Sequence, residues 1–299
     1  MTKYLLAVSG GVDSMVLLDM VATNAGGFRD RHFAGAGWTG DFVVAHYDHG
    51  IRGEESHADA DFVRAKCRQY GVRLITAQGN LPPDTGEDKA RRARYSFLGQ
   101  VAKNESTGGA ESVYIVTAHH QDDLLETIVM NLIRGTGWRG LAPMSRTDVV
   151  RPLIDMTKAD VVRYALEHDL DWREDKTNDS PEYWRNRLRA QVIGRLLTER
   201  NKMLALCHGQ RRLRVEIDYE VTRYIEQRVD CVDNRPVMYR YDLIMLPADV
   251  AIEILRRLTK GWLTRPQLGQ LLLFIKVGKP SKQLSWKRLN VRLDVRRVY

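Results

Sequence analysis

The stretch YLLAVSGGVDSMVLLDMVA, residues 4–22, places a glycine-bearing turn between a short apolar run and an amphipathic helical pattern. The run from Tyr4 to Val8 predicts a buried strand, and Met15 to Ala22 predicts a helix. The turn between them, Ser9 to Ser14, reads SGGVDS. Adjacent glycines let the backbone approach an oxyanion, and the N–H groups that open a helix favour negative charge. The turn therefore predicts a phosphate-binding loop, with a plain strand-to-helix turn as the alternative for the hexapeptide alone.

An acid stands where a common phosphate-binding loop has lysine. The residue before Ser14 is Asp13, whereas the P-loop motif has lysine next to serine or threonine. A carboxylate repels phosphate unless a cation lies between them. The loop therefore predicts a nucleotide that is held by Mg²⁺ and bound at its pyrophosphate.

Length and charge set the broad class of the protein. A chain of 299 residues is long enough for two domains, and its 43% hydrophobic and 28% charged residues are typical of a globular protein. The formal net charge is +8, which favours a polyanionic partner. The segment from Lys276 to Tyr299 contains one acid, Asp294, and eight basic residues. This end of the chain predicts either a nucleic-acid contact or a solvated basic tail.

The three cysteines, Cys67, Cys207 and Cys231, are widely spaced and form no C-x-x-C pair. This spacing indicates neither an iron–sulfur cluster nor a zinc ribbon, and a sparse odd set fits a reducing compartment. No apolar run reaches the length of a membrane span, and the apolar start is too short for a signal peptide. We therefore expect a cytoplasmic protein without a membrane partner.

The first half of the chain alternates strand and helix patterns, which predicts an α/β fold with a doubly wound parallel sheet. We expect loops at residues 25–41 and 79–86 because of their glycines and prolines. The expected strand and helix pairs are Leu5–Val8 with Met15–Ala22, Phe42–His46 with His57–Tyr70, and Val113–Ala118 with Asp122–Leu132.

Three polar segments directly follow predicted strands. They are SGGVDS, HYDHGIRGEES at residues 46–56 and TAHHQDD at residues 117–123. Ligands of parallel sheets lie beyond the carboxyl ends of the strands. We therefore expect the three segments to meet in one crevice.

The pattern changes near residue 190, which divides the chain into a catalytic domain at 1–190 and a smaller, mainly helical domain at 191–299. Residues 291–296 alternate apolar and charged side chains, which predicts a basic C-terminal strand. The helical patterns of the second domain are Gln191–Arg200, Gln210–Gln227, Ala248–Leu258 and Arg265–Phe274.

Two acids share a face of the helix predicted from residue 121. Asp123 and Glu126 lie three residues apart, so one side of the helix presents both carboxylates to a metal or a cationic substrate. The alternative is that the helix dipole favours acids in a first turn. His119 and His120 precede this helix and are expected to contact phosphate or ribose, with a metal pair or neutral, satisfied histidines as the alternatives.

The 46–56 segment brackets Asp48 with two histidines, His46 and His49, and Arg52 follows. Its spacing resembles a metal site only loosely. We expect this segment to shape the crevice or to contact substrate.

Two groups of arginines lie near aromatic residues. Arg91 and Arg94 occur in ARRARY, and Arg185 and Arg189 occur in YWRNRLR. Arginine binds phosphate bidentately, and aromatic rings stack on unpaired bases. Both groups therefore predict contact with nucleic acid, with a solvated helix face as the alternative.

These strings together resemble the tRNA(Ile)-lysidine synthetase family of PP-loop ATPases. The resemblance covers about the first 190 residues, and LTRPQLGQLLLFIKVGKPSKQL in the second domain is similar to the small helical domain of that family, in a short form. Asp48 and Ile51 stand where the family commonly has asparagine and leucine. The matching strings, in family order, are SGGVDS, HYDHGIRGEES, ARRARYSFL, TAHHQDDLLET, RGTGWRGL, RPL and DKTNDSPEYWRNRLR.

The resemblance implies an ATP-dependent ligase that attaches L-lysine to C2 of the wobble cytidine in isoleucine tRNA with a CAU anticodon. ATP adenylates the C2 oxygen, and the lysine amine then displaces AMP. Residues implied to hold ATP are Ser9, Gly10, Gly11, Val12, Asp13, Ser14 and His119, with Mg²⁺ on Asp13. Residues implied to be catalytic or to bind lysine and tRNA are Asp13, Asp123, Glu126, Arg91, Arg94, Arg185 and Arg189.

Two other functions use the same nucleotide loop or fold. A tRNA thiolase would need a persulfide-bearing cysteine or a cluster, and paired cysteines are absent from the sequence. A non-catalytic tRNA-binding relative would have no electrostatic reason to keep Asp13, Asp123 and Glu126. The sequence leaves a homodimer open.

Overall fold

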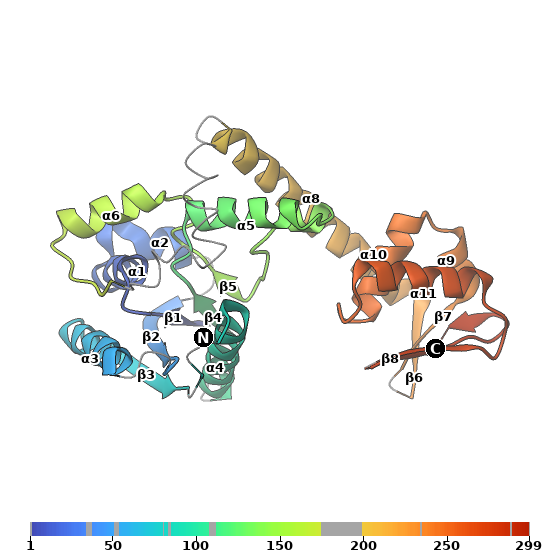
Figure 1. The fold of residues 1–299 in the computed structure, drawn as a ribbon, viewed down its shortest axis with the longest axis horizontal. Coiled ribbons are helices and arrows are strands. Elements are labelled where there is room, and N and C mark those ends of the chain that lie inside the picture. Colours follow the sequence, from blue (N-terminus) through green and yellow to red (C-terminus); the bar gives the residue numbers. More distant parts are fainter. Residues whose placement is uncertain are drawn as a thin grey trace. The chain divides into compact units, whose positions relative to one another are not determined.

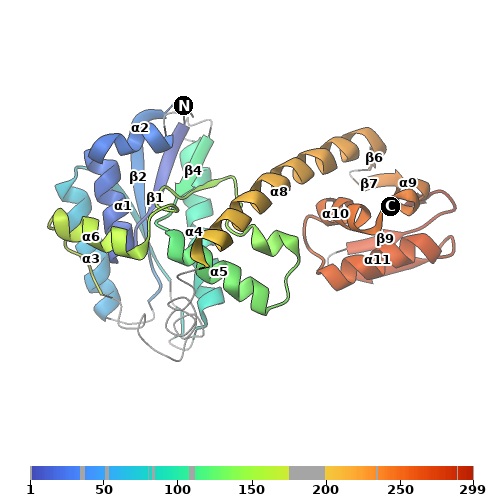
Figure 2. The same ribbon diagram turned by 90° about the horizontal axis from the view of Figure 1, so that it is seen from above.

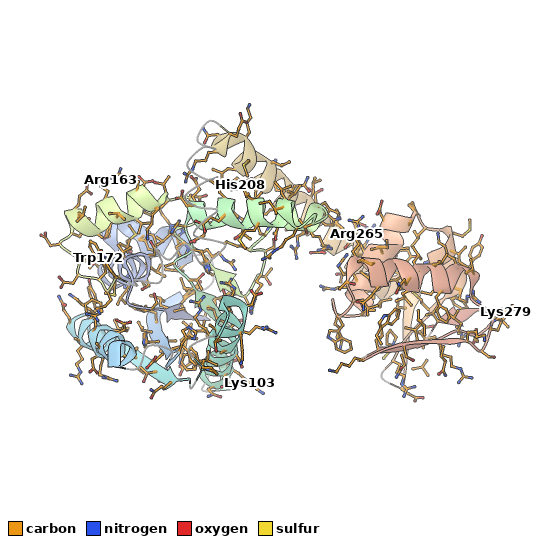
Figure 3. The ribbon with its side chains drawn as sticks, in the orientation of Figure 1. Lys103, Arg163, Trp172, His208, Arg265 and Lys279 are labelled. Atoms are coloured by element: carbon orange, nitrogen blue, oxygen red, sulfur yellow. The ribbon has the colours of Figure 1, made fainter. Side chains whose placement is uncertain are left out.

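The computed structural model describes residues 2–33, 38–50, 54–79, 81–82, 85–107, 112–174, 199–233, 235–287 and 289–298. The chain forms two compact units, Met1–His208 and Gly209–Tyr299, drawn in blue to yellow and in orange to red (Figure 1). The border lies inside the long helix α8 (Arg200–Arg228), next to the labelled His208 (Figure 3). The boundary predicted at residue 190 lies outside the described residues and stays a prediction.

The first unit contains a parallel sheet of five strands in the order β3-β2-β1-β4-β5. The register pairs Leu5 in β1 with Val43 in β2 and with Ile115 in β4. The chain therefore moves from β1 to β3 in one direction and from β4 to β5 in the other, which confirms the predicted doubly wound fold. The strands are β1 (Thr2–Ala7), β2 (Trp38–Asp48), β3 (Arg73–Gln78), β4 (Ser112–Val116) and β5 (Val149–Val150).

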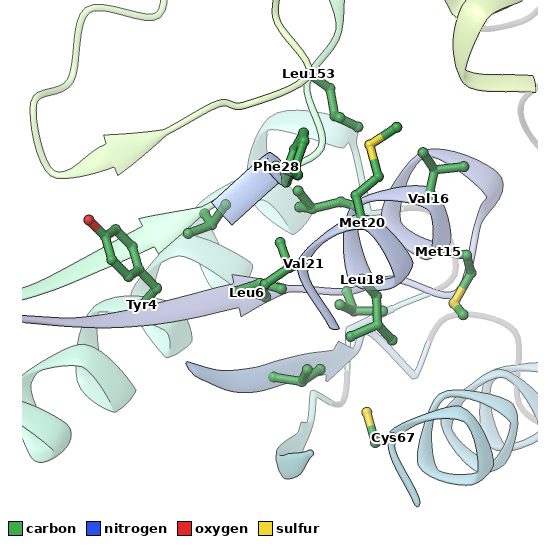
Figure 4. Packing of buried hydrophobic residues seen from close by; sticks show 14 of the residues in the cluster. Tyr4, Leu6, Met15, Val16, Leu18, Met20, Val21, Phe28, Cys67 and Leu153 are labelled. Carbon is green, nitrogen blue, oxygen red and sulfur yellow. The ribbon is translucent and has the colours of Figure 1, made fainter. Parts of the chain in front are cut away.

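Helices cover both faces of this sheet, as Figure 2 shows. The helices α1 (Val12–Thr23), α3 (Glu54–Gln69) and α6 (Lys158–Glu167) pack on one face, and α4 (Glu87–Thr107) packs on the other. Successive side chains of a strand point to opposite faces. Leu6 therefore joins the core around α1, which Figure 4 shows, while Leu5 packs toward α4.

The segment 25–41, expected to be a loop, contains regular structure. A short 3₁₀ helix, η1 (Ala25–Gly27), leads into α2 (Phe28–Phe33), and β2 already begins at Trp38. Phe28 and Phe33 are both buried, and the Phe33 ring lies 4.5 Å from that of Tyr4 in β1. Burial of these two rings stabilises a turn of helix that the local sequence does not indicate.

The second unit combines helices with two small antiparallel sheets, one in the order β10-β7-β6 and one that pairs β8 with β9. The predicted helices at 248–258 and 265–274 are confirmed. That at 210–227 is part of the longer α8, and that at 191–200 lies largely outside the described residues. The elements after α8 are β6 (Val229–Val232), β7 (Arg235–Tyr239), α9 (Arg240–Met245), α10 (Ala248–Leu258), α11 (Arg265–Val277), β8 (Gln283–Trp286), β9 (Leu289–Arg292) and β10 (Arg297–Val298).

The strand predicted over residues 291–296 is wrong in its second half. β9 ends at Arg292, and the carboxylate of Asp294 accepts hydrogen bonds from the backbone N–H groups of Arg296 and Arg297. These bonds form a turn that carries the chain into β10, which pairs with β7. The alternating pattern therefore covers the end of β9 and the turn that precedes β10.

Candidate active site

The hydroxyl of Ser14 organises the loop between β1 and α1. Its Oγ accepts hydrogen bonds from the N–H groups of Ser9 (3.1 Å) and Gly10 (3.0 Å), and it donates to the carbonyl of Gly11 (2.9 Å). Gly10 has φ +97°, a conformation that favours glycine. Gly11 caps α1, whose first N–H groups have no acceptor within the helix. The loop thus presents a helix N-terminus while Ser14 holds its shape.

The segment that follows α6 is hydrogen-bonded to the loop through Arg173. The N–H of Arg173 donates to the carbonyl of Gly10 (2.9 Å), and its guanidinium donates to Asp59 on α3 (2.9 Å). Its neighbour Trp172, labelled in Figure 3, packs against the core around α1. A β-carbon on Gly10 would lie 3.4 Å from Val63 of α3. That distance is an ordinary contact, so the positive φ of Gly10 is what requires glycine here.

The ends of three neighbouring strands meet at this loop. Near the end of β2, the Nδ1 of His46 lies 2.9 Å from the carbonyl oxygen of Val8. After β4, the Nε2 of His120 lies 3.8 Å from an Asp13 carboxylate oxygen and 3.5 Å from one of Asp123. Both histidines are buried. One histidine from each of the other two segments therefore lies next to the loop, and the crevice shared by all three segments stays a prediction.

The 46–56 segment is described only in part. Asp48 is buried and accepts a hydrogen bond from the N–H of Gly50 (2.7 Å), which closes a turn after β2. Arg52 lies outside the described residues. The structure thus gives Asp48 a role in shaping the backbone here.

A lysine that the sequence reasoning did not single out contacts the predicted metal ligand. The Nζ of Lys158 lies 2.5 Å from an Asp13 carboxylate oxygen. The backbone N–H of the same lysine donates to Asp122 (2.6 Å), which also binds the guanidinium of Arg200 (3.0 Å). The sequence does carry one signal for this position, because TKAD at 157–160 fits a capping box that begins a helix at Lys158.

The two predicted lysine-binding acids lie on α5 (Gln121–Ile133), but in different environments. The Asp123 carboxylate accepts a hydrogen bond from the N–H of His120 (3.0 Å), so it caps its own helix. Glu126 is fully buried, with 0% of its surface exposed. A third acid of this helix, Asp122, binds the first residues of α6 and α8, Lys158 and Arg200. Burial would raise the pKa of Asp122, but Arg200 and the N–H of Lys158 lower it further than burial raises it.

His119 lies between β4 and α5, where charges of both α4 and α5 act on it. Its Nδ1 is 2.7 Å from the hydroxyl of Thr117. Burial lowers the pKa of His119 far below its ordinary value. Asp123 opposes this effect, whereas Arg91, Arg94 and Arg151 add to it. His119 is therefore neutral near pH 7, and the predicted tRNA-binding arginines of α4 act on this edge of the sheet.

Three guanidinium groups surround the ring of Tyr95 on α4. Those of Arg91, Arg94 and Arg146 lie 4.9, 5.9 and 5.1 Å from its centroid. The aromatic ring holds the three cationic groups close together. A surface that binds phosphate requires cations gathered in this way. The other two predicted arginines, Arg185 and Arg189, lie outside the described residues.

Asp13 is suited to bind a Mg²⁺ ion whose other ligands come mainly from a bound substrate. The described part of the chain holds no group of three or more histidine, cysteine or acidic side chains suited to a metal ion. Mg²⁺ in nucleotide enzymes is commonly bound by one or two carboxylates together with phosphates and water. Asp13 offers one partly exposed carboxylate beside a helix N-terminus, which meets that description.

Comparison with known proteins identifies the family. Residues 1–196 match the PP-loop domain family. The chain belongs to this family. It is 31% identical over 99% of its length to a tRNA(Ile)-lysidine synthase of Solibacter usitatus, and 32% identical over 89% to one of Thermotoga maritima. The predicted resemblance is confirmed, although the chain spans only 66% and 61% of those two relatives.

A solved structure supports the fold. The U34-tRNA thiolase NcsA from Methanococcus maripaludis, with its [4Fe-4S] cluster, matches 71% of this chain and 72% of its own, with a TM-score of 0.54 and 17% identity. At this identity the likeness concerns the fold. Across the described ranges, no helix is long and apolar enough to cross a membrane.

Proposed function

We propose that this protein ligates L-lysine to C2 of the wobble cytidine of isoleucine tRNA with a CAU anticodon, using ATP. The observation that carries the proposal is the 31% identity, over 99% of this chain, to a relative named tRNA(Ile)-lysidine synthase. The convergence of Asp13, His120 and Asp123 at one sheet edge supports it. A nucleotide and an amine-binding acid can share that edge.

In the proposed first step, the C2 oxygen of cytidine attacks the α-phosphorus of ATP and pyrophosphate leaves. The first N–H groups of α1, after Gly10 and Gly11, would bind the pyrophosphate, and Ser14 would hold the loop in shape. Mg²⁺ on Asp13 would offset the charge of the phosphates. Neutral His119 would donate a hydrogen bond to phosphate or ribose.

In the proposed second step, the lysine amine attacks C2 and AMP leaves. An amine with an ordinary pKa near 10.4 arrives protonated, so a carboxylate is needed to bind it and to accept its proton. Asp123 and Glu126 are the proposed ligands. Because Glu126 is fully buried, a lysine that reached it would be bound with little water around it, which strengthens the ion pair.

The proposed tRNA contacts begin at Arg91 and Arg94, which surround Tyr95 together with Arg146. Arg185 and Arg189 are proposed as further contacts, with Arg189 near the chemistry. The wobble base is already in a loop, so turning it into the crevice costs little beyond unstacking.

A thiolase is less consistent with the cysteines of this chain. Sulfur transfer requires a reactive thiol or a cluster, and a thiolate needs a low pKa. Cys67 is buried in α3, and burial raises its pKa to about 11. Cys207 is buried in α8, and Cys231 lies in the second unit. A non-catalytic tRNA-binding protein is the other alternative, and the assay below separates all three functions.

The deciding experiment incubates the protein with ATP, labelled lysine and unmodified isoleucine tRNA with a CAU anticodon. We expect label in tRNA only when ATP is present. Methionine tRNA with the same anticodon serves as the matched substrate control. Label from a sulfur donor would favour the thiolase, and no label at all would favour the non-catalytic protein.

The Asp13→Ala variant tests the role of the loop. It should abolish tRNA-dependent exchange between ATP and pyrophosphate while tRNA binding survives, because the carboxylate serves the metal and not the RNA. Glu167→Ala removes an exposed acid of α6 that pairs with Arg163, and it should leave exchange intact. Unchanged exchange in Asp13→Ala would contradict the role assigned to Asp13.

A further inference from the structure

We propose that Lys158 occupies the metal-binding carboxylate of Asp13 in the free protein and passes to the phosphates when Mg·ATP binds. The metal and the triphosphate would then bind cooperatively, because each takes one member of an existing ion pair. This proposal rests on the proposed function only in that the SGGVDS loop binds Mg·ATP. It adds a phosphate ligand and a competitor for the metal at the same site.

Two features of Lys158 support the exchange. Its backbone is fixed in place, and its side chain is partly exposed to water. The N–H of Lys158 is held by Asp122 (2.6 Å), and the capping box of Thr157 and Asp160 fixes the start of α6. The side chain is 44% exposed and ends 2.5 Å from Asp13, whose own side chain is 33% exposed. An ion pair this accessible to water adds little net stability. Either partner can therefore be replaced at small cost.

The loop requires such a cation. SGGVDS contains no basic residue, and the N–H groups of Ser9 and Gly10 already donate to Ser14. Phosphates at the start of α1 would lie next to the carboxylate of Asp13. Among the described lysines and arginines, Lys158 has its side chain within hydrogen-bond distance of that carboxylate. It can supply from α6 the positive charge that an ordinary P-loop supplies from its own lysine.

If this exchange occurs, removing the Lys158 ammonium should have opposite effects on metal binding and on nucleotide binding. A metal ion alone must displace the ammonium of Lys158 from Asp13, so removing the ammonium should strengthen metal binding. A triphosphate gains the ammonium as a partner, so the same change should weaken triphosphate binding. A salt bridge with only a structural role would produce no such opposition.

The test measures binding to Lys158→Met, which keeps an unbranched apolar stem and removes the charge. The probes are Mn²⁺ alone, followed by electron paramagnetic resonance, and AMP and Mg·ATP, followed by calorimetry. We expect the Kd for Mn²⁺ to fall several-fold and the Kd for Mg·ATP to rise at least ten-fold. The Kd for AMP should change less than two-fold, because AMP lacks the pyrophosphate.

Three further variants control the result. Lys202→Met removes an exposed lysine that pairs with Glu199, and it should change none of the three constants. In an Asp13→Asn background, Lys158→Met should no longer strengthen Mn²⁺ binding. Lys158→Gln repeats the test if the methionine variant does not fold, since glutamine is neutral and polar.

Two outcomes would overturn the proposal. The first is that both neutral variants bind Mn²⁺ and Mg·ATP as tightly as the wild type. The second is that the variants bind both ligands more weakly. Failure of the proposed function looks different, because a wild-type protein that binds no Mg·ATP would contradict that function without any variant. A wild-type protein that binds Mg·ATP, with variants that bind it equally well, contradicts only the role of Lys158.

Discussion

At the scale of single residues, Asp19 shows how the first unit holds a charge inside its core. This residue of α1 is only 6% exposed. Its two carboxylate oxygens accept hydrogen bonds from the hydroxyls of Tyr70, after α3, and Tyr164, in α6, each at 2.7 Å. Burial, together with the carboxylate, raises the pKa of both tyrosines. The three side chains therefore join three helices on one face of the sheet.

Removing the carboxylate should cost more than removing one hydroxyl. Asp19→Ala leaves two part-buried hydroxyls without their acceptor, and we expect a loss of about 3 kcal/mol in the free energy of unfolding. Tyr70→Phe removes one donor and should cost about 1.5 kcal/mol. Denaturant unfolding measures both. Equal losses in the two variants would show that Asp19 does not hold the tyrosines together.

Residues also differ in how well the sequence predicts their roles. Gly10 and Asp13 stand out in SGGVDS because their chemistry is local to the turn. The capping box at 157–160 marks Lys158 only as the start of a helix, and neither Lys158 nor Arg200 has a local signal for its acidic partner, which lies far away in the sequence. The role of Ser14 in binding pyrophosphate stays a prediction, and the structure adds that its hydroxyl accepts hydrogen bonds from the loop backbone.

At the scale of elements, the turn from β4 to α5 places a histidine among charges from two helices. His119 lies near Asp123 of α5 and near the arginines of α4, and burial keeps it neutral by lowering its pKa. The unfolded chain has an ordinary histidine with a pKa near 6.5. Below that pH the unfolded state binds a proton that the native state does not, so stability falls as the pH falls.

This linkage predicts a pH-dependent difference between wild type and His119→Gln. Above pH 6.5 the difference in unfolding free energy should be constant. As the pH falls below 6.5 the wild type should lose stability relative to the variant, by at most about 1.4 kcal/mol per pH unit. Denaturant unfolding between pH 8 and pH 5 measures the difference. A difference that is constant over this range would contradict a neutral, partly buried His119.

Elements with a clear pattern were predicted, and elements that depend on their neighbours were not. The strands β1, β2 and β4 lie at the centre of the sheet and read as apolar runs. In β3, an edge strand, three of the six residues are exposed, so its pattern is weak. Helix α2 depends on the burial of Phe28 and Phe33, which local sequence does not reveal.

At the scale of the whole molecule, the chain forms two units with separate cores. The core of the second unit involves α8 to α11 and the small sheets, and among the described residues it shares none with the clusters of the first. Arg240 is central to this second unit. Its guanidinium donates to the carbonyls of Ile275 and Gly278, at the end of α11, and of Asp294. One side chain thus joins three segments.

Loss of these bonds should affect one unit only. Arg240→Ala leaves several carbonyls without donors, and we expect the second unit to lose about 2–3 kcal/mol of stability. Calorimetry should show a lower unfolding temperature for one transition, while the transition that Mg·ATP stabilises stays unchanged. Arg240→Lys should recover only part of the loss. A shift of both transitions together would show that the two units unfold as one.

The sequence by itself determined the strand–loop–helix unit at SGGVDS, the parallel sheet and the acids of α5, because these follow from local pattern and from the geometry of a turn. Only the tertiary structure decided which charges meet. Asp13 pairs with Lys158 because α6 returns to the face of the sheet that α1 covers. Asp122 and Asp123, adjacent in sequence, differ because one binds α6 and α8 and the other caps its own helix. Such pairings depend on how distant segments pack, which spacing along the chain does not record.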